Sequence, residues 1–212
     1  YKKTPYYSNG DPFYSDCANY CVTVTAPQSY KGAFSGEFTQ TLENGNIRYI
    51  AEAKAVRDFA FVLSKDFNVV TAQEEEIEIY YYYYNDENFE QSLDTAKQSI
   101  RTFCDLFGEY KYNTLSVVQT GFLHGGMEYP TLIYISDALE RESYIETIVH
   151  EIAHQWWYAV VGNDQITYPW LDEGLTEYST VLFYENNAQY ERSREKMIEE
   201  TLNYYKMFID IF

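Results

Sequence analysis

The sequence is poor in cysteine, proline and glycine, and each shortage excludes a class of protein. The three cysteines, Cys17, Cys21 and Cys104, are too few and of the wrong parity for a disulfide framework. Ten Gly and five Pro in 212 residues exclude collagen-like and linker-like sequence. No apolar run approaches the roughly 18 to 20 residues of a membrane-spanning helix, and Tyr1–Thr4 does not resemble the start of a signal peptide.

Aromatic and aliphatic side chains are plentiful instead. Aromatic residues make up 19% of the chain, and 24 of them are tyrosines. A chain of this composition buries a core and is not disordered. The length fits one large domain or parts of two.

Charge is concentrated in the second part of the chain. Residues 1–73 carry seven acidic and seven basic side chains, so residues 74–212 carry the whole net charge of −18. The change occurs at Glu74–Glu76, which predicts a linker or a domain edge between residues 1–73 and 74–212. An acidic surface repels nucleic acids and anionic membranes, so we expect neither as a partner. It favours cationic ligands, although solubility alone also explains it.

Residues 1–73 have the pattern of short strands. Their alternating apolar residues are interrupted by Pro, Gly or Asn, and the turn at Asn44–Asn46 separates two of the runs. We therefore predict an antiparallel β unit, with Cys17 and Cys21 as packed side chains. The expected strands are Tyr20–Ala26, Ala33–Thr39, Ile47–Ala55 and Phe59–Leu63.

Residues 74–136 mix strand and helix patterns. Ile77–Tyr84 is rich in Tyr and Ile, which favour a strand. Apolar residues then recur every three or four positions from Phe89 to Phe107, and Gly108 follows as a stop. Cys104 lies on the apolar face of this helix and is interpreted as a core residue rather than a nucleophile. Two further expected strands, Leu115–Thr120 and Thr131–Ser136, make the fold class α+β.

The pentapeptide His150-Glu151-Ile152-Ala153-His154 contains two of the three histidines in the chain. No Pro or Gly interrupts residues 143–161, so we expect one helix there. On a helix, residues i and i+4 share a face, and the two imidazoles can converge on one metal ion. Glu151 lies about 100° around the helix, where its carboxylate can take a proton from a metal-bound water. The alternative is two ordinary, partly buried helix histidines.

A catalytic zinc site needs a third protein ligand. Eighteen residues separate His154 from Glu173, which lies in a segment that we expect to be a helix. Its expected N-cap is Asp172, and its expected apolar face consists of Leu175, Tyr178, Val181 and Leu182. A reversing loop at 162–164 would bring Glu173 back to the two histidines. Glu177, one turn further, could orient a ligating histidine, or it could be a solvated helix carboxylate.

These motifs resemble those of the gluzincin aminopeptidases, the group that includes aminopeptidase N and leukotriene A hydrolase. The resemblance rests on HEIAHQWW, the spacing to Glu173, WLDEGLTEY and the upstream segment Gly125–Tyr129 (GGMEY), and it extends from Ile77 to about Tyr184. It implies a thermolysin-like catalytic domain in residues 74–212, preceded in 1–73 by the end of a β-sandwich-like domain. It also implies that Glu128 binds the free amino group of a peptide, while the edge strand with Gly125, Gly126 and Met127 binds the peptide backbone.

The sequence departs from the family pattern at two points. Tyr129 stands where the family usually has Asn. The catalytic tyrosine of the family is expected beyond Phe212, because Tyr204 and Tyr205 lie too close to Glu173 and are interpreted as core positions of a helix, together with Met197, Ile198 and Leu202. We therefore expect the 212 residues to be a portion of a longer enzyme.

The sequence thus predicts a zinc-dependent aminopeptidase acting on peptides with a free N-terminus. His150, His154 and Glu173 would hold one Zn²⁺ per chain, and Glu151 would act as general base and then general acid. The alternatives are a zinc endopeptidase or another hydrolase on the same site, and a binding module with a vestigial metal site. His124 would line the side-chain pocket or be an ordinary loop histidine. No compartment, oligomeric state or preferred N-terminal residue is predicted.

Overall fold

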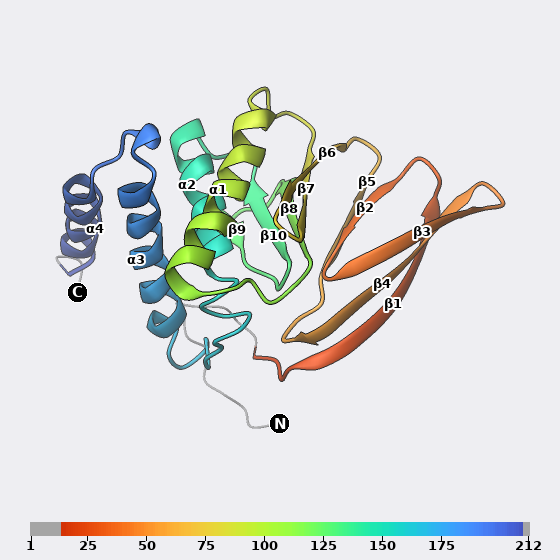
Figure 1. Ribbon diagram of the computed structural model, residues 1–212, viewed down its shortest axis with the longest axis horizontal. Coiled ribbons are helices and arrows are strands. Elements are labelled where there is room, and N and C mark those ends of the chain that lie inside the picture. The colour runs from red at the N-terminus through yellow and green to blue at the C-terminus, as the bar shows by residue number, and fades with distance from the viewer. Residues whose placement is uncertain (1–13, 210–212) are drawn as a thin grey trace.

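The computed structural model describes residues 14–209 (Figure 1). The N-terminal part is built from strands, and helices predominate after residue 89. The elements are β1 (Ala18–Pro27), β2 (Lys31–Phe34), β3 (Glu37–Glu43), β4 (Asn46–Val56), β5 (Phe61–Ser64), β6 (Asn68–Glu74), β7 (Ile77–Tyr83), α1 (Phe89–Phe107), β8 (Thr114–Thr120), β9 (Gly126–Met127), β10 (Leu132–Ser136), α2 (Arg141–Ala153), α3 (Trp170–Asn186), the 3-10 turn η1 (Ala188–Tyr190) and α4 (Arg194–Ile209).

The first five strands form the expected antiparallel β unit. Strands β1, β4 and β3 make one sheet in that order, and β2 pairs with β5. The turn between β3 and β4 has Asn44 at φ 51° and Gly45 at φ 78°, as a tight hairpin requires. The prediction of a single strand over Ala33–Thr39 was wrong, because β2 ends at Phe34 and a separate strand, β3, begins at Glu37. Gly36, at φ 78°, packs so closely on the Glu52 carbonyl that a side chain would not fit.

A five-stranded mixed sheet forms the centre of the molecule. Its order is β6-β7-β8-β10-β9, with β7, β8 and β10 parallel and the two outer strands antiparallel to their neighbours. Strand β6 was not predicted. It pairs with β7 through a turn at Glu75 and Glu76, so the acidic run is the turn of a hairpin and not a linker. The division into two domains stays a prediction, and the membership of β6 in this sheet favours an edge before Asn68.

Both faces of the central sheet are covered. Helices α1 and α2 pack on one face, where Ile79, Leu115 and Ile133 are fully buried. The β2–β5 pair covers the other face, on which Val118 and Leu132 are buried. Alternate residues of β7, β8 and β10 therefore point into two different cores, which explains why apolar side chains occur on both faces of these strands. Helices α3 and α4 lie further out, on the far side of α2 (Figure 1).

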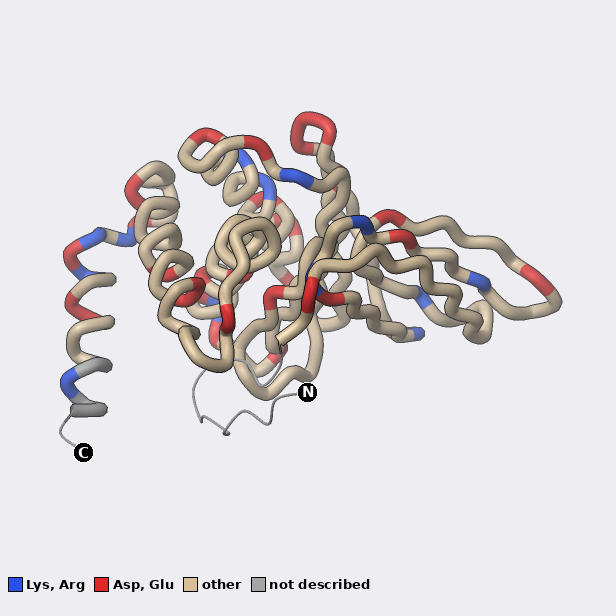
Figure 2. Tube along the Cα trace, turned by 90° about the horizontal axis from the view of Figure 1, so that it is seen from below, with Lys and Arg blue, Asp and Glu red and all other residues tan. Residues whose placement is uncertain are grey.

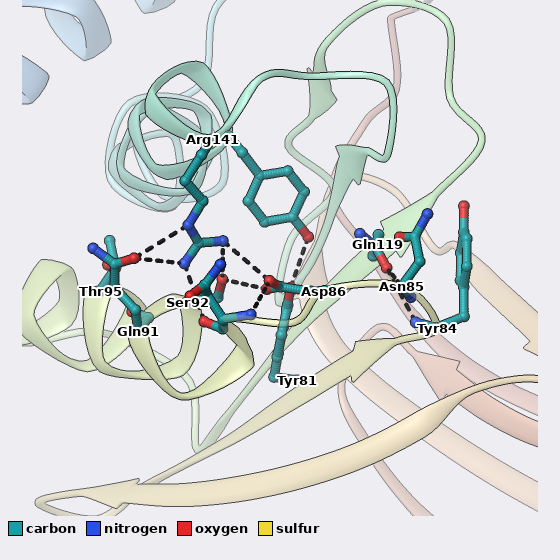
Figure 3. Close-up of polar contacts among 11 residues, drawn as sticks. Tyr81, Tyr84, Asn85, Asp86, Gln91, Ser92, Thr95, Gln119 and Arg141 are labelled. Carbon is teal, nitrogen blue, oxygen red and sulfur yellow. Dashed lines mark hydrogen bonds and ion pairs between the residues drawn. The ribbon is translucent and has the colours of Figure 1, made fainter.

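A buried polar cluster anchors the first residue of α2 (Figure 3). Asp86 lies in the loop between β7 and α1 and accepts hydrogen bonds from Ser92 Oγ and from Tyr81, at 2.5 and 2.6 Å. The Arg141 guanidinium pairs with Asp86 at 3.2 Å and also contacts Gln91. Hydrogen bonds from the protein lower the pKa of Asp86 despite its burial. The cluster fixes the N-terminal end of α2 against the sheet and α1.

The helices begin and end close to the predicted positions, with two exceptions. Helix α1 spans Phe89–Phe107, and Gly108 follows at φ 96°, as expected. The helix predicted over residues 143–161 was too long at its C-terminal end. Helix α2 ends at Ala153, and the chain continues as hydrogen-bonded turns to residue 160. Tyr204 and Tyr205 lie outside the residues whose side chains are described.

Helix α3 differs from the prediction in both its start and its buried face. It begins at Trp170, so Asp172 lies inside the first turn and is not the N-cap. Leu175 and Tyr178 are exposed, whereas Thr176 and Thr180 are fully buried. The side of α3 that packs toward the histidines therefore carries small polar side chains, and Thr176 contacts the His154 ring directly.

Surface features agree only partly with the predictions. Cys17 and Cys21 are exposed and not packed, while Cys104 is half-buried against the core as expected. Acidic residues are frequent along the helices and loops of the second half (Figure 2). Over the described residues, no helix is both long and apolar enough to cross a bilayer.

Candidate metal centre

The two histidines converge at the C-terminal end of α2. His150 lies in the last turn of the helix, and His154 follows Ala153 with helical dihedral angles. Because the helical path continues through His154, the two side chains share one face, and their Nε2 atoms lie 3.2 Å apart. His154 is 1% exposed.

Glu173 reaches the same point from α3. Its Oε2 lies 3.3 Å from Nε2 of His150 and 3.7 Å from Nε2 of His154. A tetrahedral zinc ion with bonds of about 2.0–2.1 Å keeps its ligand atoms about 3.3 Å apart. The three atoms therefore fit a single zinc ion, and two imidazoles with one carboxylate are a donor set typical of catalytic zinc.

The outer nitrogens of both rings have partners that fix the tautomer. Nδ1 of His154 lies 3.2 Å from the Trp157 carbonyl oxygen, which only accepts, so Nδ1 carries the proton. Thr176 Oγ1 lies 3.1 Å from the same nitrogen. Nδ1 of His150 similarly faces the Glu177 carboxylate at 3.4 Å. In its neutral form, each ring would thus present the lone pair of Nε2 to the shared point, as a metal ligand must.

The electrostatic field at this point favours positive charge. Burial lowers the pKa of His154, but Glu128 and Glu173 raise it more, to about 9. Burial also lowers the pKa of His150, and hydrogen bonds to Glu173 and Glu177 outweigh it, so that its pKa is well above the ordinary value. The same carboxylates that would stabilise a proton would stabilise a bound cation.

Glu151 and Glu128 form a second group of acidic side chains around His154. Carboxylate oxygens of both residues lie within 4.8 Å of a ring nitrogen of His154 and of each other. Glu151 is 6% exposed and packs directly on Gly126, where a Cβ would overlap its carboxylate. Any larger residue at Gly126 would therefore displace Glu151, which gives a physical reason for glycine at this position.

The segment with Gly125, Gly126 and Met127 forms the edge of the central sheet. Strand β9 pairs with β10 on one side and is the last strand in the sheet order. Gly125 adopts φ 73°, and its carbonyl accepts a hydrogen bond from the Ser136 amide at 2.6 Å. Met127 is buried, and Glu128 follows at the end of the strand. The structure thus places the predicted substrate-binding segment next to the predicted metal ligands.

His124 precedes this strand and stacks edge-on with the Phe122 ring at 5.7 Å. It belongs to neither group of possible metal ligands found among the described residues. Three further polar residues of the site were not predicted from the sequence: Thr176, Gln155 and Gln165. Thr176 lies one turn after Glu173, so helical periodicity could have indicated it, whereas Gln155 lies beyond the end of α2 and no helical pattern points to it. Gln165 lies in a loop, where no pattern points to it.

Comparison with known proteins agrees with this architecture. The model for the peptidase family M1 domain matches residues 91–210, more than half of the chain. Human aminopeptidase B is 37% identical over 87 residues, which are 37% of this chain and 13% of that protein. Leucine aminopeptidase 2-1 of Meyerozyma guilliermondii is 30% identical over 93 residues, covering 42% of this chain and 15% of that protein.

The fold also resembles a solved structure. A mutant M1 zinc metallopeptidase of Deinococcus radiodurans, bound to a Tyr-Ser-Ala substrate, superposes with a TM-score of 0.71 at 22% identity. The match covers 88% of this chain and 44% of that one. The fold is shared with this M1 zinc metallopeptidase structure. The chain belongs to peptidase family M1, and it spans less than half the length of the relatives that it matches.

Proposed function

We propose that these residues form part of a zinc-dependent aminopeptidase with a thermolysin-like catalytic domain. The single observation that carries this proposal is the convergence of His150, His154 and Glu173 within 3.2 to 3.7 Å, with Glu151 beside them. The relatives in the family are named as aminopeptidases, which supports the same reaction class.

One zinc ion per chain would be held by Nε2 of His150, Nε2 of His154 and the carboxylate of Glu173. When bound, zinc supplies a Lewis acid that acidifies water and polarises a carbonyl group. Glu177 orients His150 by accepting a hydrogen bond from its Nδ1, and the Trp157 carbonyl does the same for His154.

Glu151 is proposed as the general base and then the general acid. Its carboxylate is buried, lies within 4.8 Å of a His154 ring nitrogen and is not one of the three proposed ligands. It can therefore take a proton from the attacking water and pass that proton to the leaving amine. Gly126 leaves the space in which this carboxylate sits.

Glu128 is proposed to bind the N-terminal ammonium of the peptide. Its carboxylate lies near His154, so an ammonium held there would place the first peptide bond close to the ligands and Glu151. The peptide backbone would pair with the outer edge of β9, as an added strand. Free N-terminal peptides are therefore the expected substrates.

Replacing Glu151 with Gln tests the role of the base. The substitution keeps the volume and removes the proton acceptor, so we expect turnover to fall by about 10²- to 10⁴-fold while zinc content stays unchanged. Glu199→Gln, at an exposed position on α4, is the matched control and should leave both values unaltered. Wild-type turnover by Glu151→Gln would show that another group is the base.

Comparing a free peptide with its N-acetylated form tests the aminopeptidase assignment. Acetylation removes the ammonium that Glu128 would bind, so only the free peptide should be cleaved. Equal cleavage of both would replace the proposal with an endopeptidase or another hydrolase on the same site. Stoichiometric zinc with no cleavage of either peptide would favour a non-catalytic binding module.

A further inference from the structure

Gln165 is a buried amide that joins two buried carboxylates. Its Nε2 donates to Glu128 Oε1 at 2.8 Å and to Asp172 Oδ2 at 2.7 Å. The exposed fractions of Gln165, Glu128 and Asp172 are 3%, 4% and 2%. Asp172 lies directly before Glu173, so this bridge connects the proposed ammonium-binding carboxylate with the first turn of α3.

The chemistry of this bridge requires an amide. Ionised carboxylates only accept hydrogen bonds, and the NH₂ group of Gln has two hydrogens to donate. Gln165 donates a hydrogen bond to one oxygen of each carboxylate and adds no charge between the two acidic groups. Asn163 donates to the other oxygen of Asp172 at 2.8 Å, so that carboxylate is fixed from the loop as well.

The backbone behind Glu128 is held by a second amide. Gln155 Nε2 donates to the carbonyl oxygens of Glu128 and Tyr129, at 3.4 and 3.3 Å, and its Oε1 accepts from the Thr131 amide at 2.8 Å. Thr131 adopts φ 65°, a strained conformation for a β-branched residue. With the backbone fixed in this way, the bond to Gln165 restricts where the Glu128 carboxylate can lie.

We propose that Gln165 is a positioning residue for substrate binding. Its amide holds the Glu128 carboxylate in the orientation that receives the N-terminal ammonium, and through Asp172 it sets the distance of that carboxylate from the ligand helix α3. Gln165 acts through Glu128 and does not itself touch the reacting atoms. This inference rests on the proposed function, in which Glu128 binds the ammonium of a peptide substrate.

The test uses two zinc-chelating hydroxamates and the zinc-loaded protein. One probe is built on an α-amino acid, and the other is the same molecule without its amino group. Gln165→Met keeps the length of the side chain and removes both donors. The variant should lose at least about tenfold in affinity for the amino hydroxamate, because a hydrogen bond to a charged group is lost. Its zinc content and its affinity for the desamino hydroxamate should stay at the wild-type values.

The control variant is Gln73→Met. Gln73 is exposed on β6, at the opposite edge of the sheet from β9, so the same substitution there should change neither affinity. If Gln165→Met does not fold, Gln165→Asn is measured in the same way. The Asn side chain is one methylene shorter, so its amide lies further from both carboxylates.

The outcomes separate this inference from the proposed function. If the wild-type protein binds both probes equally, Glu128 is not an ammonium site, and the proposed function and the inference fail together. If the wild type prefers the amino probe and the Gln165 variant keeps that preference, only the inference is overturned. An equal loss for both probes, with zinc retained, would also overturn it, because that pattern indicates a general structural role.

Discussion

Helix α2 has a polar cluster at each end, and the two clusters are built differently. At its start, Asp86 is paired with the Arg141 guanidinium and with hydroxyl donors (Figure 3). At its end, carboxylate oxygens of Glu173 and Glu177 lie 3.3 to 3.7 Å from ring nitrogens of His150 and His154. The first cluster contains a permanent countercharge, whereas the second presents lone pairs to a shared point. The comparison shows how burial of charge for stability differs from burial of charge for binding a cation.

The largest effect is expected when a proposed zinc ligand is removed from the second cluster. His154→Ala takes away one of three proposed zinc ligands, so zinc affinity should fall by more than about 100-fold, since even outer partners of such ligands are worth 10- to 100-fold. Metal analysis after dialysis against a zinc buffer measures this. Stoichiometric zinc in this variant would contradict the comparison, because zinc binding at the second cluster would then not require the lone pair of His154.

A smaller effect is expected where the second cluster contacts the sheet edge. Gly126→Ala adds a methyl group that overlaps the Glu151 carboxylate, so turnover should fall by about 10- to 100-fold as the base is displaced, while zinc content is kept. Gly121→Ala is the matched control, since no atom lies within 4 Å of the added Cβ. Equal activity of both alanine variants would show that the position of Glu151 is not restricted by Gly126.

The smallest effect concerns the first cluster and stability alone. Asp86→Asn removes the charge opposite Arg141, which should lower the free energy of unfolding by about 1–3 kcal/mol and leave zinc content unchanged. The pKa of Asp86 is lowered in the folded protein, so its stabilisation is present above the unfolded value of about 3.9 and is lost as pH falls through the folded pKa. Urea titrations between neutral and acidic pH should show a smaller loss of stability in the variant than in the wild type.

A pH dependence at acidic pH that is identical in both proteins would contradict this account of Asp86. Loss of zinc from Asp86→Asn would also contradict the distinction between the clusters, because it would show that the cluster at the start of α2 affects zinc binding at its end.

Much of the architecture could be predicted because it depends on local patterns. The spacing from Phe89 to Phe107 and the glycine at 108 indicated α1, and residues that favour strands indicated β7, β8 and β10. The approach of His150 to His154 follows from helix geometry alone. The spacing after His154 and an expected reversing loop indicated Glu173, and the resemblance to a family supplied Glu128; the proximity of these two residues to the histidines depends on the tertiary fold.

The errors arose where long-range packing decides. The end of α2 at Ala153 has no Gly or Pro signal, and the apolar residues Leu175 and Tyr178 are exposed because α3 turns its polar face toward the histidines. The run Glu74–Glu76 suggested a linker by its charge, but strand pairing makes it part of a hairpin. Gln165 lies in a loop, and only the folded chain brings it between Glu128 and Asp172.

Crystals of the zinc-loaded protein, measured on both sides of the zinc absorption edge, give the most direct test of the metal centre. The account predicts one anomalous peak, about 2.0–2.1 Å from Nε2 of His150 and Nε2 of His154 and about 2.0–2.2 Å from a Glu173 oxygen. A peak held by Glu128, Glu151 and His154 instead, or no peak at these residues, would contradict it.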